Sequence, residues 1–404
     1  MTSEDLLFDD VVRVDDTVAR YAEGDFPFLN RSSWPESARI RDELERWFAR
    51  FPSSAVDAAR ERRDLGGRFR SRSDRDHQAA FFELFVHELL MRLTLGVEVH
   101  PAVPGLSKRP DFLVTPANGE PFYVEAVAVS GKSEAELAAE ARLAVVNDEL
   151  NKLRSPNFWL GVDVEGILTE QPPVGPIRSA LEGWLATLEP DAVVSATRDR
   201  GLDDLPHLRF SVGACQLEFF AMPKSEHARG KVEGRPLGMH GQGVKWIDPR
   251  RAIRDAIAAK GQRFSALDRP YVVAVNALDS FAGRDDIMEA LFGKEVVQVR
   301  QLPNGFSGEP EFTRELDGAF TSPQGPRYTR ISAVLVAHGV RPWSLAAERT
   351  ALCVYHSPFA ERPLVPHIPR LARAVPEGDR MTWMEGERIA SIFELAPEWP
   401  DAAC

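Results

Sequence analysis

The feature that most constrains the fold of this chain is a glutamate in the middle of an apolar run. Residues 122–129 have the sequence FYVEAVAV, so Glu125 interrupts a segment that otherwise suits a buried strand. A shorter run, DFLVTP, begins with Asp111, and the Asn118-Gly119 pair between the two runs favours a hairpin turn. Because a buried carboxylate without a partner is costly, Glu125 needs a cation, hydrogen-bond donors or a metal, unless it faces solvent.

Composition narrows the class of protein. A chain of 404 residues, 44% of them hydrophobic, predicts either two domains or one core with large additions. No run of about 18 apolar residues suggests a membrane span, and the acidic N-terminus lacks a signal-peptide pattern. Three widely spaced cysteines predict a reducing, cytoplasmic location. The net charge of −12 argues against coating nucleic acid by charge alone, but it allows a local basic face.

The order of predicted elements indicates an α/β fold with a mixed sheet flanked by helices. A buried helix from residue 78 precedes three strands, and a helix over 133–153 then crosses to a strand over 158–166 that could pair in parallel. Three regions are expected: a helical N-terminal extension over 1–77, an α/β core with helix and hairpin insertions over 78–300, and a Pro-rich region over 301–404 packed on the core. The charged run 58–76 is expected to be a solvated connector.

Three carboxylates have apolar surroundings. Glu83 lies inside the predicted buried helix, Asp111 begins one strand of the hairpin, and Glu125 lies within the other. The hairpin would place Asp111 and Glu125 side by side on neighbouring antiparallel strands. Two close carboxylates repel each other, and a shared proton or a divalent cation relieves the repulsion. Mg²⁺ (or Mn²⁺) suits such a site because it accepts one or two carboxylates and leaves other positions to water and phosphate.

This arrangement resembles a known family. A glutamate-bearing helix, a strand, the Pro110-Asp111 pair, a hairpin and then an acidic strand position resemble the PD-(D/E)XK nuclease superfamily, which has the restriction-endonuclease-like fold. In that resemblance Glu125 is the acidic residue of the E-x-K element, and Glu83 matches the helix glutamate of many members. The similarity covers about residues 78–166 and could extend to Asn276.

The resemblance implies Mg²⁺-dependent (or Mn²⁺-dependent) hydrolysis of phosphodiester bonds in DNA. Asp111 and Glu125 would be catalytic residues and metal ligands, and Glu83 a third, direct or water-mediated ligand. It also implies nucleic acid, DNA in the first place, as the partner, and it allows a homodimer. A bacterial defence or processing role in the cytoplasm would suit such an enzyme.

One position departs from the family pattern. The lysine of the E-x-K element should stand at position 127, where the sequence has Val127. If chemistry is retained, the donor is expected from the helix that follows, with Asn151 and Lys152 as the candidate catalytic residues. The alternative is a catalytically inactive module of the same fold that binds nucleic acid or protein. A structural α/β protein without a site is a second alternative.

Simpler interpretations exist for each carboxylate. Glu83 could pair with His87, four residues away on the same helix face, and Asp111 could bond only to its own turn. Glu125 could face solvent from a one-sided sheet. Glu88 is expected to form a surface ion pair with Arg92 and is left out of the site.

Overall fold

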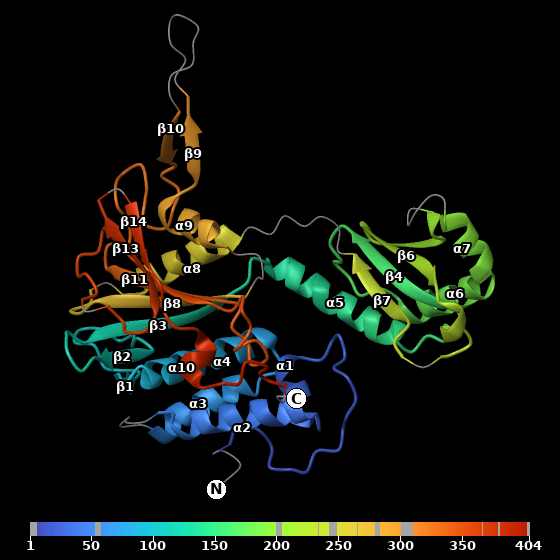
Figure 1. Cartoon of the computed structure of the whole chain (residues 1–404), viewed down its shortest axis with the longest axis horizontal. Coiled ribbons are helices and arrows are strands. Elements are labelled where there is room, and N and C mark those ends of the chain that lie inside the picture. The colour runs from blue at the N-terminus through green and yellow to red at the C-terminus, as the bar shows by residue number, and fades with distance from the viewer. Residues whose placement is uncertain are drawn as a thin grey trace, which may run out of the picture. The chain divides into compact units, whose positions relative to one another are not determined.

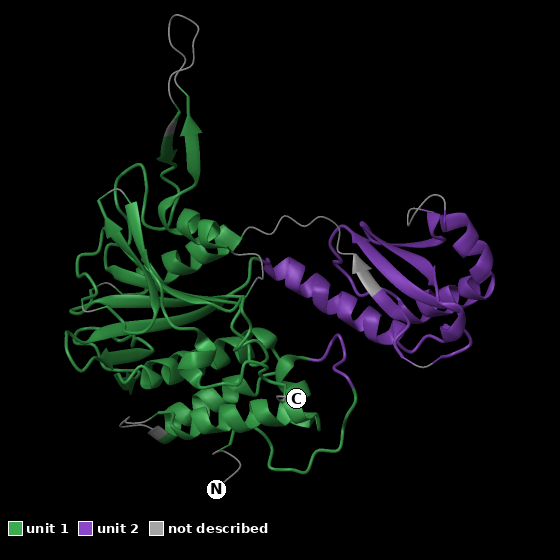
Figure 2. Ribbon diagram, viewed as in Figure 1, with its two compact units in different colours: residues 1–17, 24–131, 248–404 green, residues 18–23, 132–247 purple. Residues whose placement is uncertain are grey.

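The protein folds into two compact units, one inserted into the other (Figure 2). In the computed structural model, unit 1 comprises Met1–Thr17, Gly24–Gly131 and Asp248–Cys404, and unit 2 comprises Val18–Glu23 and Lys132–Ile247. The structure describes residues 6–52, 58–198, 204–232, 234–241, 249–264, 266–278, 283–299, 310–365, 367–378 and 380–401. The helical N-terminal region and the Pro-rich C-terminal region therefore share one unit with the core, and the divisions fall near residues 131 and 248 instead of 77 and 300.

Unit 1 is built on an eight-stranded mixed sheet, which confirms the predicted α/β class (Figure 1). In spatial order its strands are β1 (Gly96–Val99), β2 (Phe112–Thr115), β3 (Phe122–Val129), β8 (Tyr271–Ala277), β11 (Ile331–His338), β12 (Leu352–His356), β13 (Ala372–Glu377) and β14 (Arg380–Met384). The strands β3, β8 and β11 are parallel neighbours, and β1, β2 and β3 pair antiparallel. The C-terminal region, of which only 331–339 was predicted as a strand, supplies half of this sheet.

Helices cover both faces of the sheet. One face packs against α1 (Asp25–Arg31), α2 (Pro35–Ala49), α3 (Ala58–Phe69), α4 (Asp74–Arg92) and α10 (Ile389–Phe393). The other packs against α8 (Pro249–Arg263) and α9 (Arg284–Phe292). Along β3, Phe122 and Val124 face the α4 side, whereas Tyr123 and Val127 face the α8 side. Glu125 must therefore face α8, and the interpretation of a one-sided sheet is wrong for this strand.

The charged run 58–76 is not a solvated connector. Most of it forms α3 and the first turn of α4. Leu65 and Phe69, four residues apart on α3, are buried in the core, while Arg63 and Asp64 are exposed and Arg68 is half-buried. The apolar pair one helical turn apart anchors a helix that is otherwise strongly charged.

The strand that pairs in parallel with β3 is β8, and the prediction of a strand over 158–166 in that place is wrong. That segment forms β4 (Phe158–Glu165) in the sheet of unit 2. The whole of Lys132–Ile247 is inserted between the end of β3 and the start of α8. Consequently α8, and not the helix directly after β3, is the crossover helix that leads back to the parallel neighbour.

Unit 2 is smaller and consists of a sheet packed against a layer of helices. Its sheet has the order β5 (His207–Val212), β6 (Cys215–Pro223), β4 and β7 (Leu237–Gly241). Its helices α5 (Glu134–Leu150), α6 (Val174–Ala186) and α7 (Pro190–Arg198) bury Leu143, Ile177 and Val193 against that sheet. A reciprocal capping box of Ser133 and Glu136 begins α5.

Two smaller elements lie outside these two sheets. A two-stranded ribbon of β9 (Glu295–Gln298) and β10 (Glu311–Arg314) belongs to unit 1, and the short η3 (Glu226–Ala228) belongs to unit 2. Within the described ranges, none of the helices is both long and apolar enough to cross a membrane.

Candidate functional site

Asp111 lies at the point where β2 begins. Because Phe112 pairs with Val124, the next position brings Asp111 opposite Glu125, as the hairpin pattern predicted. The Ala126 N–H donates to Asp111 Oδ2 at 2.7 Å, so the carboxylate accepts from the backbone of β3. The Asp111 carbonyl in turn accepts from the His100 N–H at 2.9 Å. Asp111 is thus held from both neighbouring strands, and its interactions extend beyond its own turn.

Glu125 is fully buried on the α8 side of β3. Its Oε1 lies 2.9 Å from Lys260 Nζ and 3.1 Å from Arg263 Nε, both from the last turn of α8. Its Oε2 is buried and has no hydrogen-bond partner among the described residues. Burial, and secondly the charge of Asp111, raise the pKa of Glu125 to about 7, although Lys260 and Arg263 oppose the shift. The carboxyl can therefore exchange a proton near neutral pH.

Glu83 lies on α4, on the opposite side of β3. Its Oε2 accepts from Arg68 Nη1 of α3 at 2.8 Å, and its buried Oε1 has no hydrogen-bond partner in the described part of the chain. Burial, followed by the charge of Asp111, raises the pKa of Glu83, and Arg68 opposes this. Asp111 is therefore the charge that acts on both glutamates.

The neighbours of Glu83 on α4 have other contacts. Both ring nitrogens of His87 lack a hydrogen-bond partner within the described ranges, and the ring packs on Phe51 at 4.9 Å, so a Glu83–His87 pair does not form. Burial lowers the pKa of His87 to about 4. Glu88 does pair with Arg92 at 2.5 Å, as predicted, and also with Arg50, but the pair is not at the surface because Glu88 is buried.

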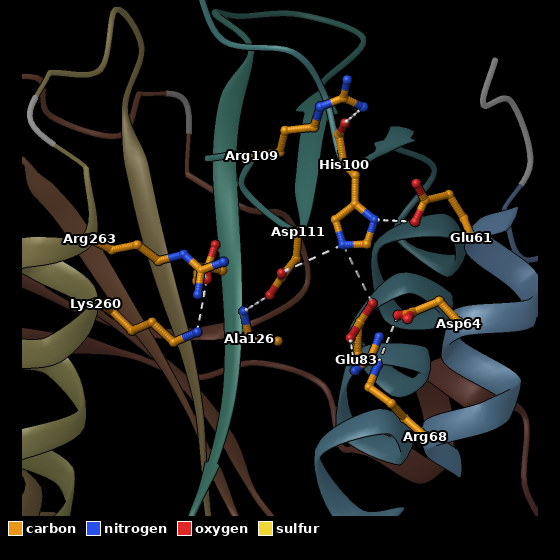
Figure 3. Close-up of polar contacts among 11 residues, drawn as sticks. Glu61, Asp64, Arg68, Glu83, His100, Arg109, Asp111, Ala126, Lys260 and Arg263 are labelled. Carbon is orange, nitrogen blue, oxygen red and sulfur yellow. Dashed lines mark hydrogen bonds and ion pairs between the residues drawn. The ribbon is translucent and has the colours of Figure 1, made fainter. Parts of the chain in front are cut away.

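A histidine that the sequence pattern did not single out lies between the carboxylates. His100, directly after β1, has a left-handed backbone with φ 46°. Its Nδ1 lies 2.5 Å from Glu61 Oε2, and its Nε2 lies 3.9 Å from both Glu83 Oε1 and Asp111 Oδ1. Arg109 donates to the His100 carbonyl at 3.3 Å. Figure 3 shows Lys260 and Arg263 on one side of β3, and His100, Asp111 and Glu83 on the other.

The three predicted carboxylates therefore do not all share one face. Glu83 and Glu125 pack against opposite faces of the sheet, and Asp111 lies at its end between them. In the described part of the chain, no three His, Cys, Asp or Glu side chains have the spacing of a formed metal site. Each face nevertheless has an oxygen that suits a hard divalent cation, because Glu83 Oε1 on the α4 side and Glu125 Oε2 on the α8 side are buried and have no hydrogen-bond donor among the described residues.

The candidate donors Asn151 and Lys152 lie elsewhere in the chain. Asn151 is the C-cap of α5, and Lys152 pairs with Glu149, so both belong to unit 2. Val127 packs into the apolar layer on the α8 side. The side chains that do contact Glu125 are Lys260 and Arg263, which sequence reasoning missed because they lie 135 or more residues further along the chain.

Comparison of the chain with family models, with curated proteins and with solved structures finds no match.

Proposed function

We propose that this protein is a metal-dependent nuclease that hydrolyses phosphodiester bonds in DNA. The observation that supports this function best is the buried ion pair of Glu125 with Lys260 of α8. Asp111 lies beside Glu125, at the start of the adjoining strand β2. A carboxylate pair next to a lysine is the combination that the resemblance to PD-(D/E)XK nucleases requires. Here the lysine comes from α8 and not from the strand position of Val127.

The position of Lys260 suits the role of the missing lysine. The side chain is held by Glu125 and is still 16% exposed, so its ammonium can meet an anionic group that approaches from solvent. Such a fixed cation stabilises the negative charge that develops on a phosphate during hydrolysis. Arg263, 38% exposed, lies beside it and can contact the same anion.

Asp111 with Glu125 or Glu83 would hold the cation. When bound, a divalent cation polarises the phosphate and lowers the pKa of the attacking water. The hydrogen bond from Ala126 fixes the Asp111 carboxylate, so its second oxygen remains directed away from β3. Glu125, with a pKa of about 7, can accept a proton near neutrality.

The surroundings of Asp111 favour an anionic substrate. Lys108 and Arg109, both exposed, directly precede Pro110 and Asp111 in the chain. Arg109 also donates to the His100 carbonyl, so positive charge lies next to the carboxylates of a protein whose net charge is −12. Such a local patch can bind a phosphate backbone even though the whole surface repels it at long range.

Cleavage of supercoiled plasmid, single-stranded DNA and RNA with Mg²⁺ or Mn²⁺ tests the proposal. We expect nicking of DNA by the wild type and a loss of about 10³-fold or more in Asp111→Asn, because the amide retains the Ala126 hydrogen bond but not the charge. Lys260→Arg keeps the ion pair with Glu125 but moves the cation, and should slow cleavage by about 10–100-fold. Asp163→Asn, an exposed strand position of unit 2, is the matched control and should cleave normally.

A second variant separates an enzyme from an inactive binding module. Val127 is on the same strand face as Glu125, so Val127→Lys places an ammonium on the side that Lys260 occupies. In the Lys260→Arg background this change should restore part of the lost rate. If the wild type and Val127→Lys are both inert with Mn²⁺ while the wild type binds DNA, the protein is a binding module. If it neither cleaves nor binds nucleic acid, the proposal is wrong altogether.

A further inference from the structure

The backbone of His100 is held in a conformation that histidine rarely adopts. Its φ of 46° lies in the left-handed region, which costs about 1 kcal/mol or more for a residue with a side chain and is often found at functional sites. The Asp111 carbonyl accepts its N–H, and Arg109 donates to its carbonyl. These contacts fix the imidazole next to Asp111.

The ring is oriented by Glu61. A carboxylate can only accept, so the contact of 2.5 Å between Glu61 Oε2 and Nδ1 places the ring proton on Nδ1. In the neutral ring Nε2 then carries a lone pair, and it faces Glu83 Oε1 and Asp111 Oδ1, each at 3.9 Å. These separations are too long for hydrogen bonds. A lone pair opposite two carboxylate oxygens is stabilised by a cation between them.

The separations leave room for one ion. Metal–ligand bonds of about 2.0–2.2 Å allow two ligands of one ion to lie up to about 4 Å apart. Glu83 Oε1 is buried without another donor, and Asp111 uses its other oxygen for Ala126. A histidine that donates its second nitrogen to a carboxylate is the usual arrangement around a metal-bound imidazole.

We propose that His100 binds the divalent cation of this site through Nε2, together with Glu83 and Asp111, and that Glu61 positions the ring. The ion then lies on the α4 side of β3, while Glu125 remains paired with Lys260 and Arg263 on the α8 side. Imidazole is a better ligand for Mn²⁺ or Zn²⁺ than for Mg²⁺, so the site should bind Mn²⁺ more tightly than Mg²⁺. The inference depends on the proposed function only for the presence of a cation.

Binding of Mn²⁺ to the full-length protein tests this assignment. Electron paramagnetic resonance measures free Mn²⁺ during a titration, and the electron spin echo modulation of bound Mn²⁺ detects a directly coordinated ¹⁴N. We expect ¹⁴N coupling in the wild type and its loss in His100→Gln, with at least about tenfold weaker Mn²⁺ binding. The ratio of Mn²⁺ to Mg²⁺ affinity should also fall. Glu61→Gln should weaken binding but retain the coupling, and His207→Gln in unit 2 is the control that should change neither.

The outcomes are distinct from those of the cleavage assay. Bound Mn²⁺ without ¹⁴N coupling in the wild type, or coupling that persists in His100→Gln, would overturn the assignment and leave a site made of carboxylates alone. Absence of Mn²⁺ binding overturns it as well. A protein that binds Mn²⁺ through nitrogen but does not cleave DNA keeps this site and loses the proposed activity. The wild-type coupling needs no variant, so a His100→Gln protein that fails to fold does not weaken the test.

Discussion

Two glutamates in the middle of strands, Glu125 in β3 and Glu218 in β6, have similar partners and different surroundings. Glu218 Oε1 lies 2.7 Å from Arg209 Nε and 3.3 Å from His207 Nδ1, as Glu125 lies close to Lys260 and Arg263. The side chain of Glu218 is 26% exposed, whereas that of Glu125 is fully buried. The same residue type with two basic neighbours is thus a surface ion pair in one sheet and the centre of a candidate site in the other.

The residues two positions away explain the difference. On the face of Glu125, the strand carries Tyr123 and Val127, both packed in the layer under α8. On the face of Glu218 it carries the exposed Gln216, and burial along β6 alternates. A carboxylate whose i±2 neighbours are both apolar lies on a covered face, because side chains two apart share a face of the sheet. Its cations must then come from the covering helix, here α8.

The largest expected contrast is in stability when one cation is removed. Lys260→Met leaves Glu125 buried beside Arg263 alone. At pH 8 this should destabilise unit 1 by about 3 kcal/mol, because the desolvation cost of the buried carboxylate is no longer offset by the lysine. Arg209→Met, the matched change at Glu218, should cost at most about 1 kcal/mol. Native-state hydrogen exchange of peptides from β3 and β6 in the full chain reports each unit separately. Equal losses at the two strands would show that burial does not distinguish the two pairs.

The second contrast is in pH dependence. The folded pKa of Glu125 is about 7, above its ordinary value of 4.5, so the stabilisation from binding its proton is complete below about pH 4.5 and lost as pH rises through 7. A shift of this size corresponds to about 3 kcal/mol. Glu125→Gln should remove this contribution to the dependence of the unfolding free energy on pH.

Urea unfolding of wild type and variant at pH 5.5 and pH 8 measures the difference between the two slopes. The wild type should lose about 2 kcal/mol more than Glu125→Gln over this interval. Because Glu83 also has a raised pKa, both proteins retain some residual slope, and only the difference belongs to Glu125. Identical slopes would mean that Glu125 remains ionised in the folded protein throughout.

The parts of this site that are local in the sequence were predictable. The Asn118-Gly119 turn and the two apolar runs fix the hairpin, and its register follows, so Asp111 and Glu125 were expected on adjacent strands and are found there. The buried helix with Glu83 was also expected. All of these depend on patterns within about twenty residues, where periodicity and turn chemistry are informative.

The partners of these carboxylates were not predictable in the same way. Lys260 is separated from Glu125 by the segment Lys132–Ile247 of unit 2, so no local pattern connects them. Arg68 lies in a run of charges that suggested a solvated connector, although Leu65 and Phe69 indicate a packed helix. The role of His100 depends on a left-handed backbone that a single histidine after a strand does not reveal.

The smallest effect expected is at Glu218, and it tests the surface side of the comparison. Glu218→Gln removes the charge but keeps a side chain of the same size opposite Arg209, so the unfolding free energy of unit 2 should change by less than about 1 kcal/mol. The difference should shrink further in 1 M salt, where exposed charges are screened within about 3 Å. Hydrogen exchange of β6 at low and high salt measures both. If Glu218→Gln costs as much as Lys260→Met, and salt has no effect, the Glu218 pair is energetically buried despite its exposure, and the i±2 rule drawn from Glu125 fails.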